Sequence, residues 1–180
     1  MIEIKTIGRG GQGAVTFSQI LAIAAFYDNY QSQAMPSFGV ERRGAPSFSY
    51  TRISEEPIHL RSLIYNPDIV IVLDASLLES IDVTEGLKPQ GTIIINSNKS
   101  PKELKIKGKY NIHTVDATSI ALKLFKKNIV NTAMLGAFSK ITEKITLESL
   151  YKGIEERFEG KYKLIELNKQ AIKQVYKKIK

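Results

Sequence analysis

The sequence of 180 residues contains no cysteine, no tryptophan and only two histidines. Without cysteine the chain can form no disulfide, no thiolate zinc site and no iron–sulfur cluster of its own, because these centres need sulfur ligands from the protein. His59 and His113 are far apart, and neither has a glutamate at metalloprotease spacing, so we expect no metal site. If the chain works in redox chemistry, it does not carry the electrons itself.

Long apolar runs are also missing. The longest ones, at residues 69–73 and 92–95, have the length of buried strands and fall far short of the roughly 20 residues that cross a bilayer. The sequence reaches a glycine cluster within ten residues, without the basic end and apolar stretch of a secretory signal. We therefore expect an intracellular, cytoplasmic protein with no membrane partner.

Positive charge is in excess, with 26 Lys and Arg against 18 Asp and Glu and a net charge of +8. From Tyr151 onward nine basic residues stand against four acidic ones, so most of the excess is assigned to the C-terminal region. The lysines there are mixed with glutamates and lack interleaved aromatic residues, which favours a solvated helix face over nucleic-acid binding. The length predicts one domain, residues 1–180.

Strand and helix patterns alternate along the chain. Strands are expected over residues 2–7, 30–35, 48–53, 68–74, 91–96 and 111–115, and helices over 12–27, 75–85, 116–125, 131–141, 147–158 and 164–179. Gly86 is expected to mark the end of the helix at 75–85. The fold class predicted is α/β, as a single-domain, Rossmann-like, open and mostly parallel sheet with helices on both faces and a helical C-terminal region.

A glycine cluster follows the first expected strand. Gly8, Gly10, Gly11, Gln12 and Gly13 fit the G-x-G-x-x-G spacing at the opening of a helix. Glycines there permit a tight turn and a close ligand approach, and the amides at a helix N-terminus stabilise an anion. The same glycines would also serve close packing of helix and strand, or the approach of a partner's backbone.

A dinucleotide enzyme additionally needs an acidic residue at the end of the second strand to bind the ribose hydroxyls. Here that strand ends at Met35 and Pro36, and Asp28 precedes it. The NAD hypothesis is therefore disfavoured.

A charged loop follows the second strand and is expected at the same sheet edge as the glycine cluster. Arg42 and Arg43 suit bidentate binding of a phosphate or carboxylate, with Glu41 holding one of them and Phe38 as an apolar anchor. Arginine and aromatic residues are also typical of protein–protein hot spots, so ligand contact and subunit contact both remain open.

No catalytic set is recognisable, since the sequence has no cysteine nucleophile and no G-x-S-x-G elbow. Asp68 and Asp74 bracket one strand, a position where turn or cap chemistry is the usual role of aspartate.

Four motifs together resemble the gamma subunit of the 2-oxoacid:ferredoxin oxidoreductase family. They are GRGGQGAVT at residues 8–16, FGVERRGAP at 38–46, DVTEGL at 82–87 and VNTAMLGAF at 130–138. The likeness spans nearly the whole chain, and the intact residues 41–46 favour the pyruvate branch over the 2-oxoglutarate branch.

The resemblance implies a cytoplasmic hetero-oligomer that converts pyruvate and coenzyme A to acetyl-CoA and CO2 with reduction of ferredoxin, or runs in reverse as pyruvate synthase. It implies alpha, beta and delta partner subunits, which would chiefly hold thiamine diphosphate, Mg and the [4Fe-4S] clusters. This chain would have no catalytic residue and no cofactor of its own.

We expect the chain to shape the subunit interface and the coenzyme A channel through a small set of candidate residues. They are Gly8, Gly10, Gly11, Gln12, Gly13, Arg42 and Arg43. Two alternatives remain, a free-standing Rossmann-like nucleotide-binding protein and a gamma subunit shared with a branched-chain 2-oxoacid oxidoreductase.

Overall fold

The computed structural model describes residues 1–37 and 44–179. Its strands are β1 (Ile2–Arg9), β2 (Gln31–Pro36), β3 (Pro46–Ser54), β4 (Ile69–Val72), β5 (Thr92–Asn96) and β6 (Asn111–Val115). Its helices are α1 (Ala14–Tyr27), α2 (Ala117–Phe125), α3 (Asn131–Thr142), α4 (Leu147–Arg157) and α5 (Tyr162–Lys178), with the 3-10 segments η1 (Ala75–Glu79) and η2 (Pro101–Leu104). The six predicted strands and five of the six predicted helices are confirmed to within a few residues.

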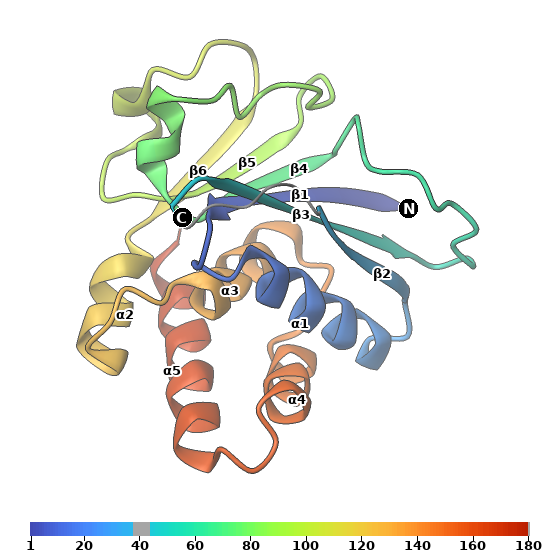
Figure 1. The fold of residues 1–180 in the computed structure, drawn as a ribbon, viewed down its shortest axis with the longest axis vertical. Coiled ribbons are helices and arrows are strands. Elements are labelled where there is room, and N and C mark those ends of the chain that lie inside the picture. Colours follow the sequence, from blue (N-terminus) through green and yellow to red (C-terminus); the bar gives the residue numbers. More distant parts are fainter. Residues whose placement is uncertain (38–43, 180) are drawn as a thin grey trace.

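The strands form one sheet in the order β2-β3-β1-β4-β5-β6 (Figure 1). β1, β4, β5 and β6 pair in parallel, which confirms the predicted open, mostly parallel sheet. β3 is the exception, because it runs antiparallel to both of its neighbours, β1 and β2. Only nine residues join β2 to β3, and a parallel connection needs a longer crossover.

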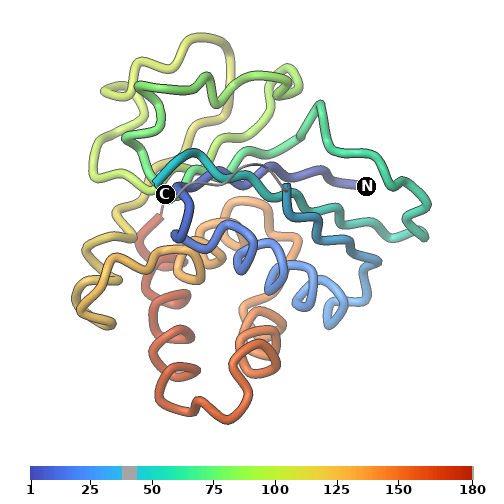
Figure 2. Tube along the Cα trace, viewed as in Figure 1, coloured from blue at the N-terminus to red at the C-terminus, as the bar shows by residue number. Residues whose placement is uncertain are grey.

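The five α-helices described lie together on one side of the sheet, and α4 and α5 extend away from it as a hairpin (Figures 1 and 2). The larger core lies between this layer and the sheet, with Ile4, Phe17, Phe138 and Ile172 among its fully buried side chains. α3 and α5 pack closely, since a Cβ on Gly136 would lie 2.2 Å from the carbonyl oxygen of Ile172. The predicted helical C-terminal region is confirmed.

The opposite side of the sheet is covered by η1, η2 and loops, which pack on β4, β5 and β6 around a smaller core. The expected helical cover of this face therefore consists of two 3-10 segments. The prediction of one helix over 75–85 is wrong beyond Glu79, because the Asp82 carboxylate accepts hydrogen bonds from the Thr84 amide and hydroxyl (2.9 and 2.6 Å). A local turn of this kind competes with helix formation.

Gly86 has a different role from the predicted helix stop. Its φ is +76°, and a Cβ there would lie 2.1 Å from the carbonyl oxygen of Tyr65. The close approach of the preceding loop therefore requires glycine at this position.

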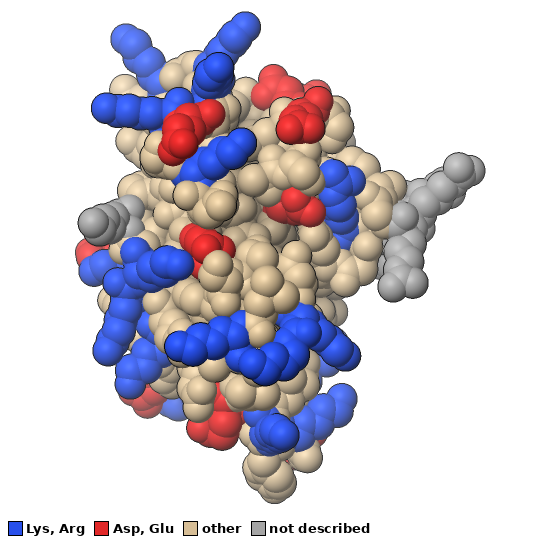
Figure 3. Space-filling view, turned by 90° about the vertical axis from the view of Figure 1, so that its left-hand side faces the viewer, with Lys and Arg blue, Asp and Glu red and all other residues tan. Residues whose placement is uncertain are grey.

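Figure 3 shows Lys and Arg gathered in two groups, one over the segment around η2 and one over α2 and α5. Residues 99–109 hold five lysines and one glutamate, a net +4. The expectation that most of the excess lies in the C-terminal region is thus incomplete. No helix among the described residues is long and apolar enough to cross a membrane.

Candidate functional site

The glycine loop joins the end of β1 to the start of α1, as predicted. Gly11 (φ +91°) and Gly13 (φ +81°) both adopt the left-handed conformation that favours glycine. A Cβ on Gly13 would lie 2.2 Å from the side-chain nitrogen (Nδ2) of Asn131 in α3, whereas a Cβ on Gly11 would meet no described atom within 4 Å. Gly13 is thus needed for packing, while Gly11 leaves the backbone open to an approaching molecule.

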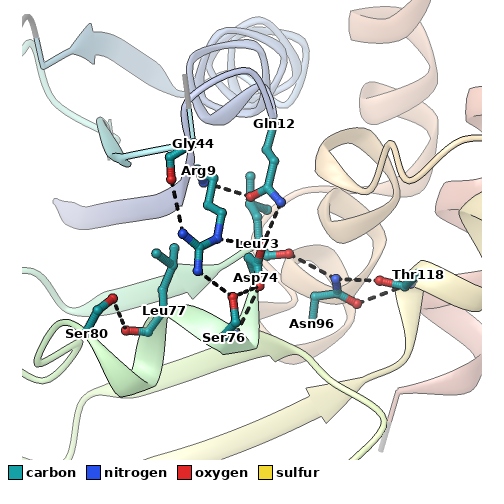
Figure 4. A network of polar contacts seen from close by, with 10 residues as sticks. All are labelled: Arg9, Gln12, Gly44, Leu73, Asp74, Ser76, Leu77, Ser80, Asn96 and Thr118. Atoms are coloured by element: carbon teal, nitrogen blue, oxygen red, sulfur yellow. Dashed lines mark hydrogen bonds and ion pairs between the residues drawn. The ribbon is translucent and has the colours of Figure 1, made fainter. Parts of the chain in front are cut away.

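Arg9, the last residue of β1 at the start of this loop, is the centre of a polar network (Figure 4). Its guanidinium donates to the Gly44 carbonyl oxygen (3.1 Å) and the Ser76 hydroxyl (2.8 Å) and lies 3.3 Å from the Asp74 carboxylate. Gln12 accepts from the Arg9 amide (2.7 Å) and donates to Asp74 (2.9 Å). The network therefore ties the glycine loop to the end of β4 and to the residues that precede β3.

Asp74 is also the N-cap of η1, because its carboxylate accepts from the Ser76 amide. Burial acts to raise the pKa of Asp74, but hydrogen bonds from Ser76 and Gln12 and the charge of Arg9 outweigh it and hold the pKa below its ordinary value. The predicted cap role of Asp74 is confirmed. Its pairing with Arg9 was not predicted from the sequence.

The network occupies the crevice between β1 and β4. The sheet extends from β1 toward β2 on one side and from β4 toward β6 on the other, so this is the point where the strand order reverses. Open α/β sheets bind ligands in such a crevice, at the carboxyl ends of the strands. Here contacts among the Arg9, Gln12 and Asp74 side chains span it, and this argues against a dinucleotide at this position.

Asp28 supports the same conclusion. It follows the C-terminal end of α1, whereas the glycine loop precedes the N-terminal end. Its carboxylate accepts from the Thr146 amide (2.7 Å) and from the hydroxyls of Thr146 and Ser149 (2.9 and 2.6 Å). Asp28 therefore fastens the start of α4 to α1, a structural role that leaves it unavailable to a ribose.

The charged loop meets the glycine loop at its flank. The Gly10 amide donates to the Ala45 carbonyl oxygen (2.8 Å), and the Gly44 amide donates to the Gly10 carbonyl oxygen (3.3 Å). Among the described residues, a Cβ on Gly44, like one on Gly11, would meet nothing within 4 Å. The expected common edge of the two loops is thus confirmed where Gly10 contacts Gly44 and Ala45.

The side chains predicted to act from the charged loop lie outside the described residues. They are Phe38, Glu41, Arg42 and Arg43. Their role stays a prediction.

A cleft of about 480 Å³ continues from this network along the carboxyl ends of β4, β5 and β6. Asn96 at the end of β5, only 7% exposed, organises it. Its side-chain amide donates to the Leu73 carbonyl oxygen and the Thr118 hydroxyl (both 2.9 Å), and its oxygen accepts from the Ala117 and Thr118 amides (3.0 and 3.2 Å).

Sequence reasoning missed Asn96. The available signal was a single amide residue directly after an apolar strand. Among the residues described, no group of three or more His, Asp or Glu side chains could hold a metal ion.

Comparison with known proteins identifies the family. The sequence model of the family described as pyruvate ferredoxin/flavodoxin oxidoreductase matches residues 3–178. The chain is 53% identical over 176 residues to pyruvate synthase subunit PorC of Methanocaldococcus jannaschii, covering 98% of this chain and 96% of that one. It is 49% identical over 181 residues to the pyruvate/ketoisovalerate oxidoreductases common subunit gamma of Pyrococcus furiosus, covering 99% and 97%.

A solved structure agrees with these relatives. The crystal structure of pyruvate oxidoreductase subunit PORC from Thermotoga maritima superposes with a TM-score of 0.86 at 39% identity, covering 99% of this chain and 97% of that one. This chain therefore belongs to the pyruvate ferredoxin/flavodoxin oxidoreductase family.

Proposed function

We propose that the chain is the gamma subunit of a pyruvate:ferredoxin oxidoreductase, or pyruvate synthase. The observation that carries the proposal is the identity of about half of all residues, over nearly the full length, to subunits with that role. The reaction converts pyruvate, coenzyme A and oxidised ferredoxin to acetyl-CoA, CO2 and reduced ferredoxin, and is reversible. The partners would be the alpha, beta and delta subunits, with ferredoxin bound by the complex.

The residue types of this chain fit a subunit without redox centres. Thiamine diphosphate with Mg supplies carbanion chemistry, and [4Fe-4S] clusters carry electrons. The sequence holds no cysteine with which to ligate a cluster. We therefore assign these groups chiefly to the partner subunits, and assign to this chain the shaping of the subunit interface.

Coenzyme A is the ligand that the site fits best, because it carries phosphate groups. The glycine loop opens α1, whose first turn has no acidic residue, and a helix N-terminus stabilises an anion. The Arg9 side chain is 37% exposed at the same edge. Gly11 and Gly44 leave open backbone there, next to the loop that carries Arg42 and Arg43. The candidate set is Gly8, Gly10, Gly11, Gln12, Gly13, Arg42 and Arg43.

The test replaces Arg42 and Arg43 singly with alanine in the assembled complex. Coenzyme A affinity and the yield of assembled complex are both measured, with Arg157→Ala on exposed α4 as the matched control. Weaker coenzyme A binding with normal assembly supports the channel role, and failed assembly assigns the loop to the interface. Unchanged values for both variants would sink the hypothesis.

A second candidate is a gamma subunit shared with a branched-chain 2-oxoacid oxidoreductase, favoured by the name and 49% identity of the Pyrococcus furiosus relative. Co-purification of this chain with two distinct sets of partner subunits from its native cell would establish sharing. A single set would exclude it. Tight binding of NAD, NADP or FAD to the lone chain in calorimetry would instead favour a free-standing nucleotide-binding protein.

A further inference from the structure

β3 places its small polar side chains toward α1 and its aromatic side chains on the other face. Ser49 is fully buried, donates its hydroxyl hydrogen bond to the Ala14 carbonyl oxygen (2.7 Å) and lies 2.7 Å from the Ser18 hydroxyl. Phe48 and Tyr50, which alternate with it, therefore point away from the helices. A strand with helices on one face normally points its large apolar side chains toward those helices. β3 is unusual because its aromatic side chains lie on the opposite face.

Neighbouring strands add to this face. Tyr50 lies directly opposite Lys5 in β1 and Met35 in β2, and residues directly opposite share a face of the sheet. The Lys5 ammonium lies 5.3 Å from the centroid of the Phe48 ring. All four side chains are half-buried. We name Lys5, Met35, Phe48 and Tyr50 the open sheet face, because the five α-helices described lie on the other side of the sheet in Figure 1; Phe48 also packs at the edge of the smaller core.

The segment of residues 55–66, which we name the rim segment, borders the open sheet face and is held in place by a side chain of β3. Arg52, 1% exposed, donates to the carbonyl oxygens of Leu60 and Leu63 (3.5 Å each) and pairs with Glu3 (3.0 Å). On the outside, Leu63 is 43% and Tyr65 74% exposed. A segment that is already fixed loses little conformational entropy when its exposed apolar side chains bind a partner.

Lys5 indicates what the partner must bring. Among the described residues no carboxylate lies within ion-pair distance of its ammonium, and Asp82 interacts with its charge only at longer range. Covering Lys5 with an apolar surface alone would bury an unpaired charge, which is costly. A stable cover therefore needs a carboxylate opposite Lys5, surrounded by apolar side chains for Phe48 and Tyr50.

We propose that the open sheet face docks a partner subunit of the same oxidoreductase complex, through an apolar surface that carries one carboxylate. The proposal rests on the proposed function, because that function supplies a partner. A second copy of this chain fits less well. In a two-fold contact of this face with itself, the open sheet face offers Lys5 no carboxylate, and the nearby Glu3 is already paired with Arg52.

The experiment uses the complex assembled from the other subunits encoded in the same genome. Binding of this chain to the complex that lacks it is measured for wild type, Tyr50→Ser and Lys5→Glu. Tyr162→Ser and Lys163→Glu, on exposed positions of α5, are the matched controls. Far-UV circular dichroism melts show which variants are folded.

We expect Tyr50→Ser and Lys5→Glu each to weaken binding by about 30-fold or more, as at an interface hot spot, with both controls close to wild type. Wild-type binding by both variants would overturn the docking site and leave the proposed function intact. Dimers of the lone chain that Tyr50→Ser abolishes would assign the face to a second copy and overturn it too. Failure of wild type to join the complex would refute the proposed function, and the docking site with it.

Discussion

Replacing Gly13 with alanine tests how the glycine loop is built. Gly11 and Gly13 have similar backbone conformations, with φ of +91° and +81°, so alanine at either position incurs the same left-handed strain, about 1–2 kcal/mol. Only at Gly13 does the new methyl group meet another residue, since its Cβ would lie 2.2 Å from the amide nitrogen and 3.0 Å from the Cγ of Asn131. The two variants thus separate strain from packing.

The structure allows an estimate of the unfolding free energy that Gly13→Ala loses through overlap with Asn131. Asn131 is 7% exposed and opens α3, so its side chain has little room to move aside. Forcing a methyl group into such a site costs about 1–3 kcal/mol in addition to the strain. We therefore expect Gly11→Ala to lower the free energy of unfolding by about 1–2 kcal/mol and Gly13→Ala by about 2–5 kcal/mol.

The double variant Gly13→Ala/Asn131→Ala makes the comparison specific. The Asn131 amide donates only a long hydrogen bond to the Gly13 carbonyl oxygen (3.3 Å), and its own oxygen has no partner within the described part of the chain. Removing this side chain should therefore cost little and relieve the overlap. Urea unfolding followed by far-UV circular dichroism measures all four chains. Equal losses for Gly11→Ala and Gly13→Ala, or no relief in the double variant, would refute the packing role.

Three further substitutions test other parts of the site. Because the pKa of Asp74 is lowered in the folded state, its contribution is complete above the unfolded pKa of about 3.9 and is lost as the pH falls through the folded value. Urea unfolding measures the difference in free energy of unfolding between wild type and Asp74→Asn. This difference should be constant between pH 7 and about pH 5 and should disappear in stronger acid. A difference that grows in acid would contradict this. Arg52→Met leaves the half-buried Glu3 carboxylate with only Lys88 at 3.9 Å and removes the donor to the Leu60 and Leu63 carbonyl oxygens. It should lower the free energy of unfolding by about 1–3 kcal/mol, with faster proteolysis in the rim segment. Asn96→Ala should cost about 2–3 kcal/mol in thermal melts, because it leaves the Ala117 and Thr118 amides of α2 without their acceptor.

The elements of the fold were predictable because hydrophobic periodicity is local. Alternation in β3 and continuous apolar character in β4 and β5 place these strands correctly. Periodicity does not show which of the two faces of a strand the helices cover. Phe48 and Tyr50 share a face by alternation, but only the three-dimensional arrangement shows that α1 packs on Ser49 instead. The failed helix after Glu79 has a local cause, the competing turn at Asp82, which is written in the sequence as an Asp-x-Thr motif.

The site was predictable in position and less so in detail. Two loops after parallel strands must emerge at one sheet edge, and the bonds between Gly10, Gly44 and Ala45 confirm that they meet there. The pairing of Arg9 with Asp74 joins positions that are 65 residues apart in the sequence, and no local pattern encodes such a contact. Motif reasoning treats Arg9 as a variable position between glycines, although its side chain links both loops to the sheet.

The polar contacts across the crevice between β1 and β4 change where we expect a ligand to approach this fold. In a dinucleotide enzyme the glycine motif borders the crevice between the two strands and leaves it to the pyrophosphate. Here contacts among Arg9, Gln12 and Asp74 span that crevice, so we expect an anion to approach the loop at Gly11 and Gly44, where an added Cβ would meet no described atom within 4 Å. That side borders Gly44 and Ala45, which directly follow the two predicted arginines in the sequence. We therefore predict that the same glycine spacing serves here in a subunit that contributes one wall of a site, since the crevice that would enclose a cofactor is spanned by the Arg9–Asp74 pair.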